Sequence, residues 1–337
     1  MDGEITLSPS LLGECIPAKT FRDNRQPVTS LCFDATGELC VTSAQDESLH
    51  IYNCREGKHQ STLHSKKYGV NLARFTHQKT TVIYASTKED DTLRYLSVHD
   101  NKFIRYFRGH TDKVVSLEMS PIDDQFLSSS LDKTVRLWDL RSPTCQGVVH
   151  AKGRPTAAFD PEGLIFALGV DSSTVKMYDL RAYESGPFAT CDIADTYYYP
   201  KGLPDWTSLK FTNNGKHILL STSGQTHYIL DAFSGNIIQR LSGFSRLGVD
   251  TCGEETGLSP DGRFVFSGGR DGKLYIWDIE NPNPASAAGV IQDNLPMTAL
   301  DTPHTDNLRV FGFNPYYMMF VTGSDELEFW QSKQPAL

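Results

Sequence analysis

One group of side chains in the middle of the sequence has the types needed for acid–base and nucleophilic chemistry. It contains His110, Ser128, Ser130, Asp132 and Trp138. A histidine placed between a serine hydroxyl and a carboxylate is the arrangement that activates serine in many hydrolases. His150 and His304, however, precede an apolar turn residue by nine positions, as His110 does, so this spacing belongs to a repeat. We therefore predict that these residues form buried hydrogen-bond networks that hold a Trp indole N–H in place.

A second group is a series of aspartates, one in a turn of each of several repeats. Its members are Asp46, Asp132, Asp171, Asp271 and Asp325. Such carboxylates could line a central channel and bind a metal, but one turn Asp per unit is also what the repeat requires structurally. The sequence contains no phosphate-binding loop, His-Glu-x-x-His, Gly-x-Ser-x-Gly or clustered Cys and His spacing. We expect a protein without enzymatic activity, cofactor or metal.

The repeat is marked by a recurring turn, in which an apolar residue is followed by polar residues, often Pro, and then Gly. Its copies begin at residues 33, 75, 119, 159, 211, 258 and 313, with gaps of 42, 44, 40, 52, 47 and 55 residues. Pro presets φ and Gly tolerates positive φ, so each copy predicts a hairpin turn. Alternating apolar runs that close on an aromatic residue follow each turn, and their period of two predicts strands.

A unit of about 40–45 residues that opens with Gly-His and ends with Trp-Asp is typical of a WD-repeat blade. Seven such units need about 280–315 residues, so one ring uses nearly all 337 residues. We predict an all-β, seven-bladed WD-repeat β-propeller that forms a single domain over residues 1–337. Only seven residues follow Trp330, too few for an outer strand. We therefore predict that an N-terminal strand, about residues 14–22, completes the last blade and removes its exposed edge.

The composition of the chain argues against two classes of direct partner, nucleic acids and membranes. The net charge is 32 − 41 = −9, which argues against general nucleic-acid binding, because affinity for phosphate comes mainly from Lys and Arg. No apolar stretch approaches the ~20 residues of a membrane helix, and no secretory signal follows the acidic N-terminus. Seven dispersed cysteines without a Cys-x-x-Cys pair favour a reducing intracellular compartment. We expect neither nucleic acid nor membrane as a direct partner.

Charge is distributed unevenly along the chain. Residues 50–155 hold 17 basic and 11 acidic side chains, a net charge of +6, whereas the remainder holds 15 and 30, a net charge of −15. The basic sector consists of Lys66, Lys67, Arg94, Arg105, Arg108, Lys113, Arg136, Lys152 and Arg154. We expect it to form a rim that receives an acidic or phosphorylated partner segment, with Tyr68 beside its lysines. A solvated surface without a partner is the alternative.

Two insertions lengthen the later repeats. Residues 182–206 contain Tyr197, Tyr198 and Tyr199. Exposed tyrosines are typical interface anchors, so Tyr197 and Tyr198 are candidate contacts, although they could equally pack beneath their own loop. Residues 285–301, rich in Ala and Pro, are expected to form a mobile connector with no chemistry of its own.

Several longer stretches closely resemble one family. They are Ser65–Val70, Asp90–Phe107, Ser130–Pro143, Phe159–Phe166 and Gly186–Thr190. The family is the small WD-repeat subunit shared by the COMPASS histone lysine methyltransferase and the cleavage and polyadenylation factor. The resemblance implies a nuclear, non-catalytic scaffold that docks the methyltransferase catalytic chain, joins the other COMPASS subunits and serves the phosphatase module that acts in mRNA 3′-end formation and transcription termination. It also implies recruitment to the phosphorylated tail of RNA polymerase II.

A different function is suggested by a short motif. Trp138-Asp-Leu-Arg141 matches the Trp-Asp-x-Arg box of substrate receptors of cullin-type ubiquitin ligases, and Tyr178-Asp-Leu-Arg181 is a weaker copy. Because this box is short and occurs in many propellers, the ligase receptor is kept as the alternative to the scaffold.

Overall fold

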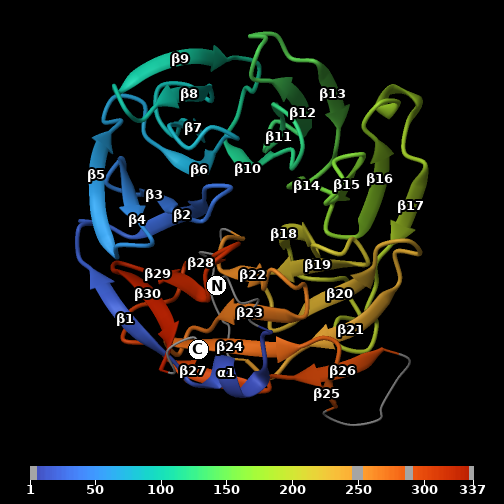
Figure 1. Ribbon diagram of the computed structural model, residues 1–337. Helices are drawn as coiled ribbons and strands as arrows, with labels where there is room; N and C mark the ends of the chain where they lie inside the picture. Colours follow the sequence, from blue (N-terminus) through green and yellow to red (C-terminus); the bar gives the residue numbers. More distant parts are fainter. Residues whose placement is uncertain (1–5, 245–252, 285–290, 334–337) are drawn as a thin grey trace.

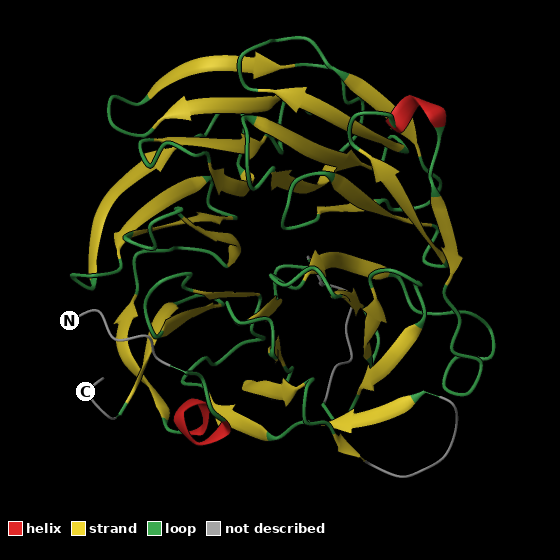
Figure 2. Ribbon diagram, turned by 45° about the vertical axis from the view of Figure 1, so that its right-hand side comes forward, coloured by secondary structure: helices red, strands yellow, loops and turns green. Residues whose placement is uncertain are grey.

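The computed structural model describes residues 6–244, 253–284 and 291–333. Seven β-sheets stand around a central axis, each with its first strand innermost (Figure 1). The predicted seven-bladed WD-repeat propeller is thereby confirmed. In the described part of the chain only α1 (Pro9–Gly13) and the 3-10 turn η1 (Tyr183–Ser185) are helical (Figure 2), and neither has the length and apolar character that crossing a bilayer requires.

Blades 1 to 4 each contain four consecutive antiparallel strands. Blade 1 is formed by β2 (Val28–Phe33), β3 (Leu39–Ala44), β4 (Ser48–Asn53) and β5 (Lys58–His64). Blade 2 is formed by β6 (Asn71–Phe75), β7 (Thr81–Ala85), β8 (Leu93–Ser97) and β9 (Lys102–Phe107). Blade 3 is formed by β10 (Val114–Met119), β11 (Gln125–Ser130), β12 (Thr134–Asp139) and β13 (Gly147–His150). Blade 4 is formed by β14 (Thr156–Phe159), β15 (Ile165–Val170), β16 (Thr174–Asp179) and β17 (Ala189–Asp192).

Blades 5 to 7 depart from this simple succession. Blade 5 is formed by β18 (Trp206–Phe211), β19 (His217–Thr222), β20 (His227–Asp231) and β21 (Ile237–Leu241), extended by β26 (Gln292–Leu295) and β25 (Asn283–Pro284). Blade 6 is formed by β22 (Thr256–Leu258), β23 (Phe264–Gly268), β24 (Lys273–Asp278) and β27 (Thr298–Asp301). Blade 7 is formed by β28 (Val310–Phe313), β29 (Met319–Gly323), β30 (Leu327–Ser332) and β1 (Cys15–Phe21).

The N-terminal strand closes the ring. β1 pairs antiparallel with β30, from Cys15 opposite Ser332 to Phe21 opposite Leu327, and lies outside β30 in Figure 1. This confirms the predicted completion of the last blade. Because one sheet then contains both the first and the last strand of the described chain, opening the ring requires breaking a full ladder of backbone hydrogen bonds.

Aromatic side chains from adjacent blades pack together and hold the ring. Trp138 of blade 3 is fully buried, and its ring lies 5.7 Å from that of Phe107 at the end of blade 2. Phe126, on the neighbouring strand of the same blade, stacks on the indole with ring centroids 6.2 Å apart and lies 4.9 Å from Phe107. In blade 7, Phe320 and Trp330 repeat the stacked pair at 5.4 Å. Because the Phe107–Trp138 contact crosses between sheets, it helps to bury the facing apolar sides of blades 2 and 3 against each other.

The prediction of a mobile connector over residues 285–301 is wrong for the part of it that the structure describes. Residues 285–290 lie outside the described part, but β26 and β27 follow directly. β26 is polar, with the sequence Gln292-Asp-Asn-Leu295, so apolar alternation did not reveal it. It is held by buried hydrogen bonds: the Asn294 carboxamide N–H donates to the Gln239 carboxamide oxygen at 3.1 Å and to the Asp278 carbonyl at 2.9 Å.

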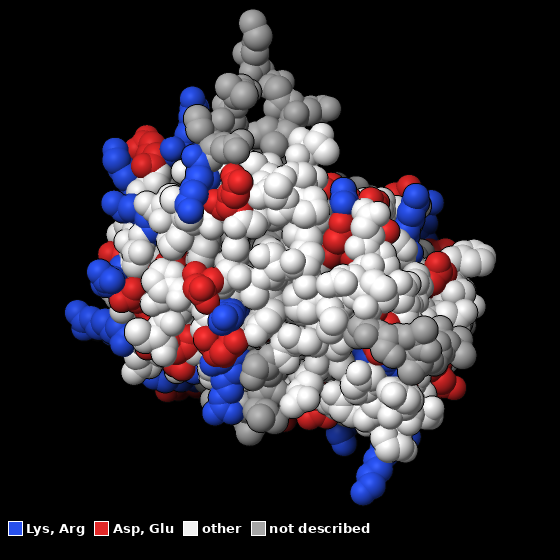
Figure 3. All heavy atoms as spheres, turned by 90° about the horizontal axis from the view of Figure 1, so that it is seen from below, with Lys and Arg blue, Asp and Glu red and all other residues white. Residues whose placement is uncertain are grey.

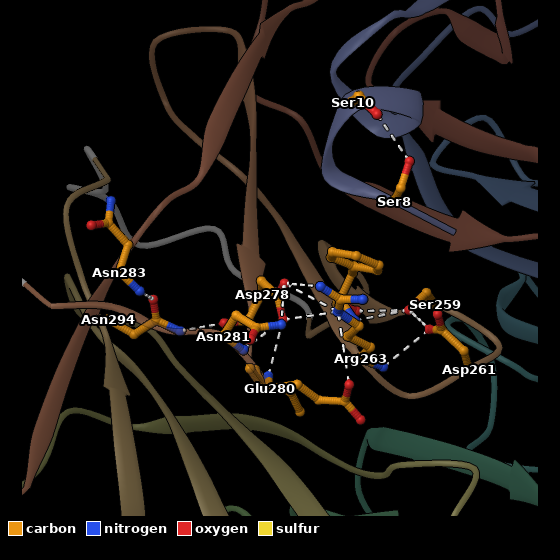
Figure 4. A network of polar contacts seen from close by, with 12 residues as sticks. Ser8, Ser10, Ser259, Asp261, Arg263, Asp278, Glu280, Asn281, Asn283 and Asn294 are labelled. Carbon is orange, nitrogen blue, oxygen red and sulfur yellow. Dashed lines mark hydrogen bonds and ion pairs between the residues drawn. The ribbon is translucent and has the colours of Figure 1, made fainter. Parts of the chain in front are cut away.

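The same region is tied to blade 6 by a charged network (Figure 4). Arg263 donates from Nε to the Asp278 carboxylate at 3.1 Å and from Nη2 at 2.5 Å. Asp278, the aspartate of this blade's Trp-Asp ending, also accepts from the backbone N–H groups of Glu280 and Asn281. The turn that leaves β24 toward β25 is therefore fixed by one carboxylate.

Candidate functional site

The structure brings four residues of the predicted blade 3 network together. His110 lies between Asp132, 2.8 Å from its Nδ1, and Ser128, whose Oγ is 2.7 Å from its Nε2. The indole N–H of Trp138 donates to the same Oγ at 2.8 Å. Ser128 and Trp138 are completely buried, so no substrate can contact the hydroxyl. Despite its hydrolase-like composition, the arrangement can orient an indole but cannot act on a substrate.

The surroundings lower the pKa values of both His110 and Asp132, so that near pH 7 the imidazole is neutral and the carboxylate is charged. Burial lowers the pKa of His110, which stays neutral near pH 7. Burial also raises the pKa of Asp132, but the hydrogen bonds from Thr134 and His110 outweigh it and bring that pKa to about 2. A neutral imidazole that donates to a carboxylate and accepts from a serine hydroxyl satisfies every member of the group.

Ser130 is not a member of this network and makes hydrogen bonds beside it. Its hydroxyl donates to the Asp112 carbonyl at 2.7 Å and accepts from the Asp132 backbone N–H at 3.1 Å. It therefore fastens the loop before β10 to the turn after β11.

Blade 7 contains a second network with a different hydroxyl. His304 Nε2 lies 2.9 Å from Thr322 Oγ1, and the Trp330 indole N–H donates to that oxygen at 2.8 Å. Thr322 was not predicted because only serine was considered at this position. It is nevertheless equivalent to Ser128, since Thr322 pairs with Glu328 as Ser128 pairs with Arg136. Ser324 replaces the aspartate, 3.1 Å from His304 Nδ1.

His150 is exposed at the end of β13, contrary to the expected buried role. The physical reason lies in blade 4, where the register places Leu168 opposite Lys176, the position of the network hydroxyl in blade 3. Tyr178 stands where blades 3, 6 and 7 have Trp. With neither a hydroxyl nor an indole N–H available, a buried imidazole would lack partners.

The basic sector does not form one continuous surface. Arg94 is only 3% exposed, which corrects its expected place on the rim. Its Nε donates to Ser86 Oγ at 2.8 Å, and its Nη2 lies 2.9 Å from both oxygens of Asp90. The guanidinium carbon is 3.5 Å from the centroid of the Tyr68 ring. Arg94 is buried because aromatic rings cover it, which spacing along the chain does not reveal.

We call Tyr68, Arg94, Phe103 and Tyr106 the aromatic–arginine cluster. Phe103 and Tyr106, both 39% exposed on β9, lie 5.8 and 5.2 Å from the Arg94 guanidinium. Two further cations border it: Lys67 Nζ is 5.1 Å from the Tyr68 ring, and Arg108 is 5.9 Å from the Tyr106 ring. Phe103 and Tyr106 were not singled out from the sequence, although their alternation with charged residues on an outer strand is a usable signal.

The remaining arginines of the sector mostly serve the fold. Arg105 donates to the Leu140 carbonyl and so joins blade 2 to blade 3. Arg136 donates to Thr134 Oγ1 at 3.3 Å and is half-buried, as is Arg154. Lys66, Lys67 and Arg108 are exposed. On the side of the ring that carries α1, basic and acidic side chains are interspersed around a wide uncharged area (Figure 3), so the structure does not extend the basic rim there.

The tyrosines of the insertion are partly exposed and partly fixed. Tyr197 is 66% exposed and Tyr198 is 44% exposed. The ring of Tyr198 lies 4.4 Å from the guanidinium of Arg240, which is 2% exposed and donates to Asp195 at 2.6 and 2.8 Å. Arg240 also donates to Asp293 of β26. One buried arginine thus holds the insertion against blade 5.

The axial cavity has a volume of about 610 Å³ and contains opposite charges that neutralise one another. Arg74 Nη2 contacts the Glu254 carboxylate at 2.5 Å, and Lys210 Nζ donates to the Thr256 carbonyl at 2.5 Å. Burial raises the pKa of Glu118 to about 8. Among the described residues, no three His, Cys, Asp or Glu side chains are placed to hold a metal ion.

Arg141, the arginine of the Trp-Asp-x-Arg box, lies in the turn after β12. Its side chain is 72% exposed, and it donates from Nη2 to Asp139 at 2.6 Å and from Nε at 2.9 Å. The two residues therefore stabilise their own turn.

Comparison with known proteins agrees with this architecture. The family model "WD domain, G-beta repeat" matches residues 15–53, 101–139 and 238–278. The chain is 44% identical to WD repeat-containing protein 82 of Drosophila melanogaster, over 97% of both chains. It is 34% identical to the Set1 complex component swd2 of Schizosaccharomyces pombe, over 97% of this chain and 99% of that one. It is 35% identical to the COMPASS component SWD2 of Saccharomyces cerevisiae, over 90% of each. The chain belongs to this WD-repeat family, whose members include WD repeat-containing protein 82 and the swd2 components of the Set1 and COMPASS complexes.

Proposed function

We propose that this protein is a non-catalytic scaffold subunit of a COMPASS-type histone lysine methyltransferase complex in the nucleus. The observation that carries the proposal is likeness over nearly the whole chain to relatives named as components of the Set1 and COMPASS complexes. The use of the His, Ser, Asp and Trp residues inside the blades supports it, because these groups are hydrogen-bonded to one another and buried. Partner binding would then use the rims and outer strands of the ring.

The proposed docking surface includes the exposed members of the basic sector and the aromatic–arginine cluster. Lys66, Lys67 and Arg108 present charge to solvent, while Tyr68 is held by Arg94. Arg105, Arg136 and Arg154 are half-buried, so they would contribute to the electrostatic field more than to direct contact. Tyr197 and Tyr198, fixed by Arg240, form a second candidate surface on blade 5. The partners at these surfaces are the methyltransferase catalytic chain and the other COMPASS subunits.

We extend the proposal to the cleavage and polyadenylation factor, where the chain would serve the phosphatase module in 3′-end formation and termination. Recruitment to the phosphorylated tail of RNA polymerase II is part of the same proposal. The support is the sign of the charge at Lys66, Lys67 and Arg108, since phosphate is recognised by such cations. No observation in the fold favours the ubiquitin-ligase receptor over these assignments.

Affinity purification of the full chain from nuclear extract tests the proposal. We expect the methyltransferase catalytic chain, other COMPASS subunits and the phosphatase module to be recovered and identified by mass spectrometry. Recovery of a cullin adaptor in place of these subunits would overturn the proposal.

A further inference from the structure

Blade 5 shows that an outer strand of this ring accepts an additional strand. β26 pairs in parallel with β21, with Gln292 opposite Gln239 and Asn294 opposite Leu241. The strand comes from the connection between β24 and β27, the third and fourth strands of blade 6, so it reaches β21 from outside the four-stranded unit. The backbone of an edge strand offers unpaired N–H and C=O groups, and here the chain itself satisfies them.

The edge that receives β26 follows a bulge. Ile229 of β20 pairs with Gln239, but the next residue, Leu230, pairs with Ile237, so Ile238 is left without a partner. β26 pairs with the three residues immediately after this bulge. The bulge therefore does not block augmentation of the outer strand, although bulges often protect edges.

β9 of blade 2 has the same construction without the added strand. Tyr95 of β8 pairs with Arg105, and Leu96 pairs with Phe103, so Ile104 is the bulged residue. Arg105 to Phe107 are thus equivalent to Gln239 to Leu241. Within the described chain, β9 ends the sheet order of its blade and no strand pairs with its outer edge.

The side chains of β9 make this edge unusually apolar. Phe103, Ile104 and Tyr106 are 39%, 48% and 39% exposed, three of the large hydrophobic side chains that the described structure leaves exposed. A groove of about 420 Å³ is lined by Ile104, Arg105, Tyr106, Arg108 and Pro143. On β13, the equivalent strand of blade 3, Val148 is the one large apolar side chain that is exposed, at 41%. Protected edges usually carry charges rather than such a stretch.

The charges around both edges indicate the chemistry of the occupant. In blade 5 the added strand places Asp293 directly opposite Arg240, and the two form an ion pair. In blade 2 the cations Lys67, Arg94 and Arg108 surround the aromatic rings beside the edge. An incoming strand with acidic residues next to apolar ones would meet complementary charge there.

We propose that an extended acidic segment of a partner protein adds to blade 2 as a fifth strand, parallel to β9. The inference rests on the proposed function, because the partner is taken to be a subunit of the methyltransferase complex. The segment would pair with Arg105 to Phe107, place apolar side chains on Phe103 and Ile104, and direct a carboxylate toward Lys67 and Arg108.

Hydrogen–deuterium exchange on the full chain tests this pairing, with and without the purified methyltransferase complex. The amides of Phe103 to Arg108 should exchange at least about tenfold more slowly in the complex. The amides of Gln239 to Leu241, which β26 already pairs, serve as an internal reference and should be protected in both states. Protection in the free chain that depends on its concentration would instead identify a second copy, and would overturn the proposal.

Matched variants separate the edge from the fold. Ile104→Asp and Arg108→Glu should each reduce co-purification of the methyltransferase catalytic chain about tenfold. Val148→Asp on β13 and Lys58→Glu on β5, which change exposed side chains on other outer strands, should leave it unchanged. Thermal melting of all four variants, followed by circular dichroism and compared with the wild type, verifies that they are folded. If wild type recovers the complex but β9 amides stay unprotected and the β9 variants still bind, the fifth strand is wrong while the scaffold function stands. If wild type recovers none of the complex, the scaffold function itself fails.

Discussion

The indole N–H of Trp138 donates to the hydroxyl oxygen of Ser128, 2.8 Å away, at a point where both side chains are completely buried. The same oxygen contacts His110, so one hydroxyl joins the third strand of blade 3 to the loop that enters the blade. A buried polar group is costly when it lacks a partner. The stability of the ring therefore depends on this small group more than on its surface charges.

Removing the hydroxyl should destabilise the protein. Ser128→Ala leaves both Trp138 and His110 without their shared partner and should lower the free energy of unfolding by about 1–3 kcal/mol. Ser129 is the matched control, because it is equally buried in β11 but its hydroxyl has no partner in the described structure. Ser129→Ala should be neutral in urea unfolding. Equal losses for the two variants would contradict the network.

Truncating the indole itself should cost more. Trp138→Ala removes the packing against Phe107 and Phe126 as well as the hydrogen bond. Core aromatic truncations of this kind cost about 3–5 kcal/mol. Normal expression and an unchanged melting temperature would show that the indole does not hold the blade.

Glu328 should make stability depend on pH. It is completely buried in β30, its carboxylate oxygens have no hydrogen-bond partner among the described residues, and burial raises its pKa to about 7. His304, 3.6 Å away, is kept neutral above pH 4, because burial lowers its pKa to about 4. The folded state thus holds a proton on Glu328 that the unfolded state releases at lower pH, so stability falls as pH rises through 7.

The variant Glu328→Gln should remove the part of the pH dependence that comes from Glu328, while the part from Glu118, whose pKa burial also raises, should remain. Between pH 5 and 8 we expect the wild type to lose up to about 3 kcal/mol that the variant retains. Glu56→Gln, on an exposed turn, is the control and should follow the wild type. Parallel urea titrations at several pH values measure the difference, and identical slopes for Glu328→Gln and wild type would refute the buried neutral carboxyl.

Arg240 should be indispensable for blade 5. Arg240→Met would leave the carboxylates of Asp195 and Asp293 buried without a cation, and breaking such a pair costs about 3–5 kcal/mol. Adding Asp195→Asn and Asp293→Asn to the same variant should recover part of that loss. Thermal unfolding of the single and triple variants measures both effects. A triple variant less stable than the single one would show that charge is not the cause.

The exposed lysines should act on binding without affecting the fold. Reversing Lys66 and Lys67 to Glu should weaken recovery of an acidic partner, most strongly at low salt, because exposed charges are screened. Lys201 and Lys216, exposed in and near blade 5, give a double reversal of the same net charge as control. Binding that is equal for both double variants at every salt concentration would exclude this part of the rim.

Arg141→Ala separates the scaffold from the ligase receptor. The ion pair with Asp139 is exposed to solvent, which screens it, so the fold should be unaffected. We expect unchanged recovery of methyltransferase subunits. Loss of a bound cullin adaptor in the variant would support the receptor instead.

Much of the architecture could be predicted because it is local and periodic. Hairpin turns, alternating strands and the residue count after Trp330 sufficed for the seven blades and for β1. β26 could not be found this way, since its side chains are polar and its parallel pairing joins Gln239 to Gln292, far apart in sequence. Its partners become visible only once the ring is closed.

The buried networks and the basic sector were predicted only in part, because some of their contacts also depend on residues outside the local repeat. Spacing along one blade placed His110 with Ser128, Asp132 and Trp138, but it took no account of Leu168, which removes the hydroxyl that His150 would need. Arg94 looked exposed because charge alone was counted. Its burial depends on Tyr68, Phe103 and Tyr106 converging from a loop and an outer strand, which is a tertiary property.

The central claim concerns membership of a methyltransferase complex. It is tested most directly by purifying that complex from nuclei through its catalytic chain and measuring the amount of this protein per catalytic chain across a salt gradient. The scaffold account predicts a constant ratio that persists with the other COMPASS subunits. A complex that retains those subunits and contains none of this protein would contradict it.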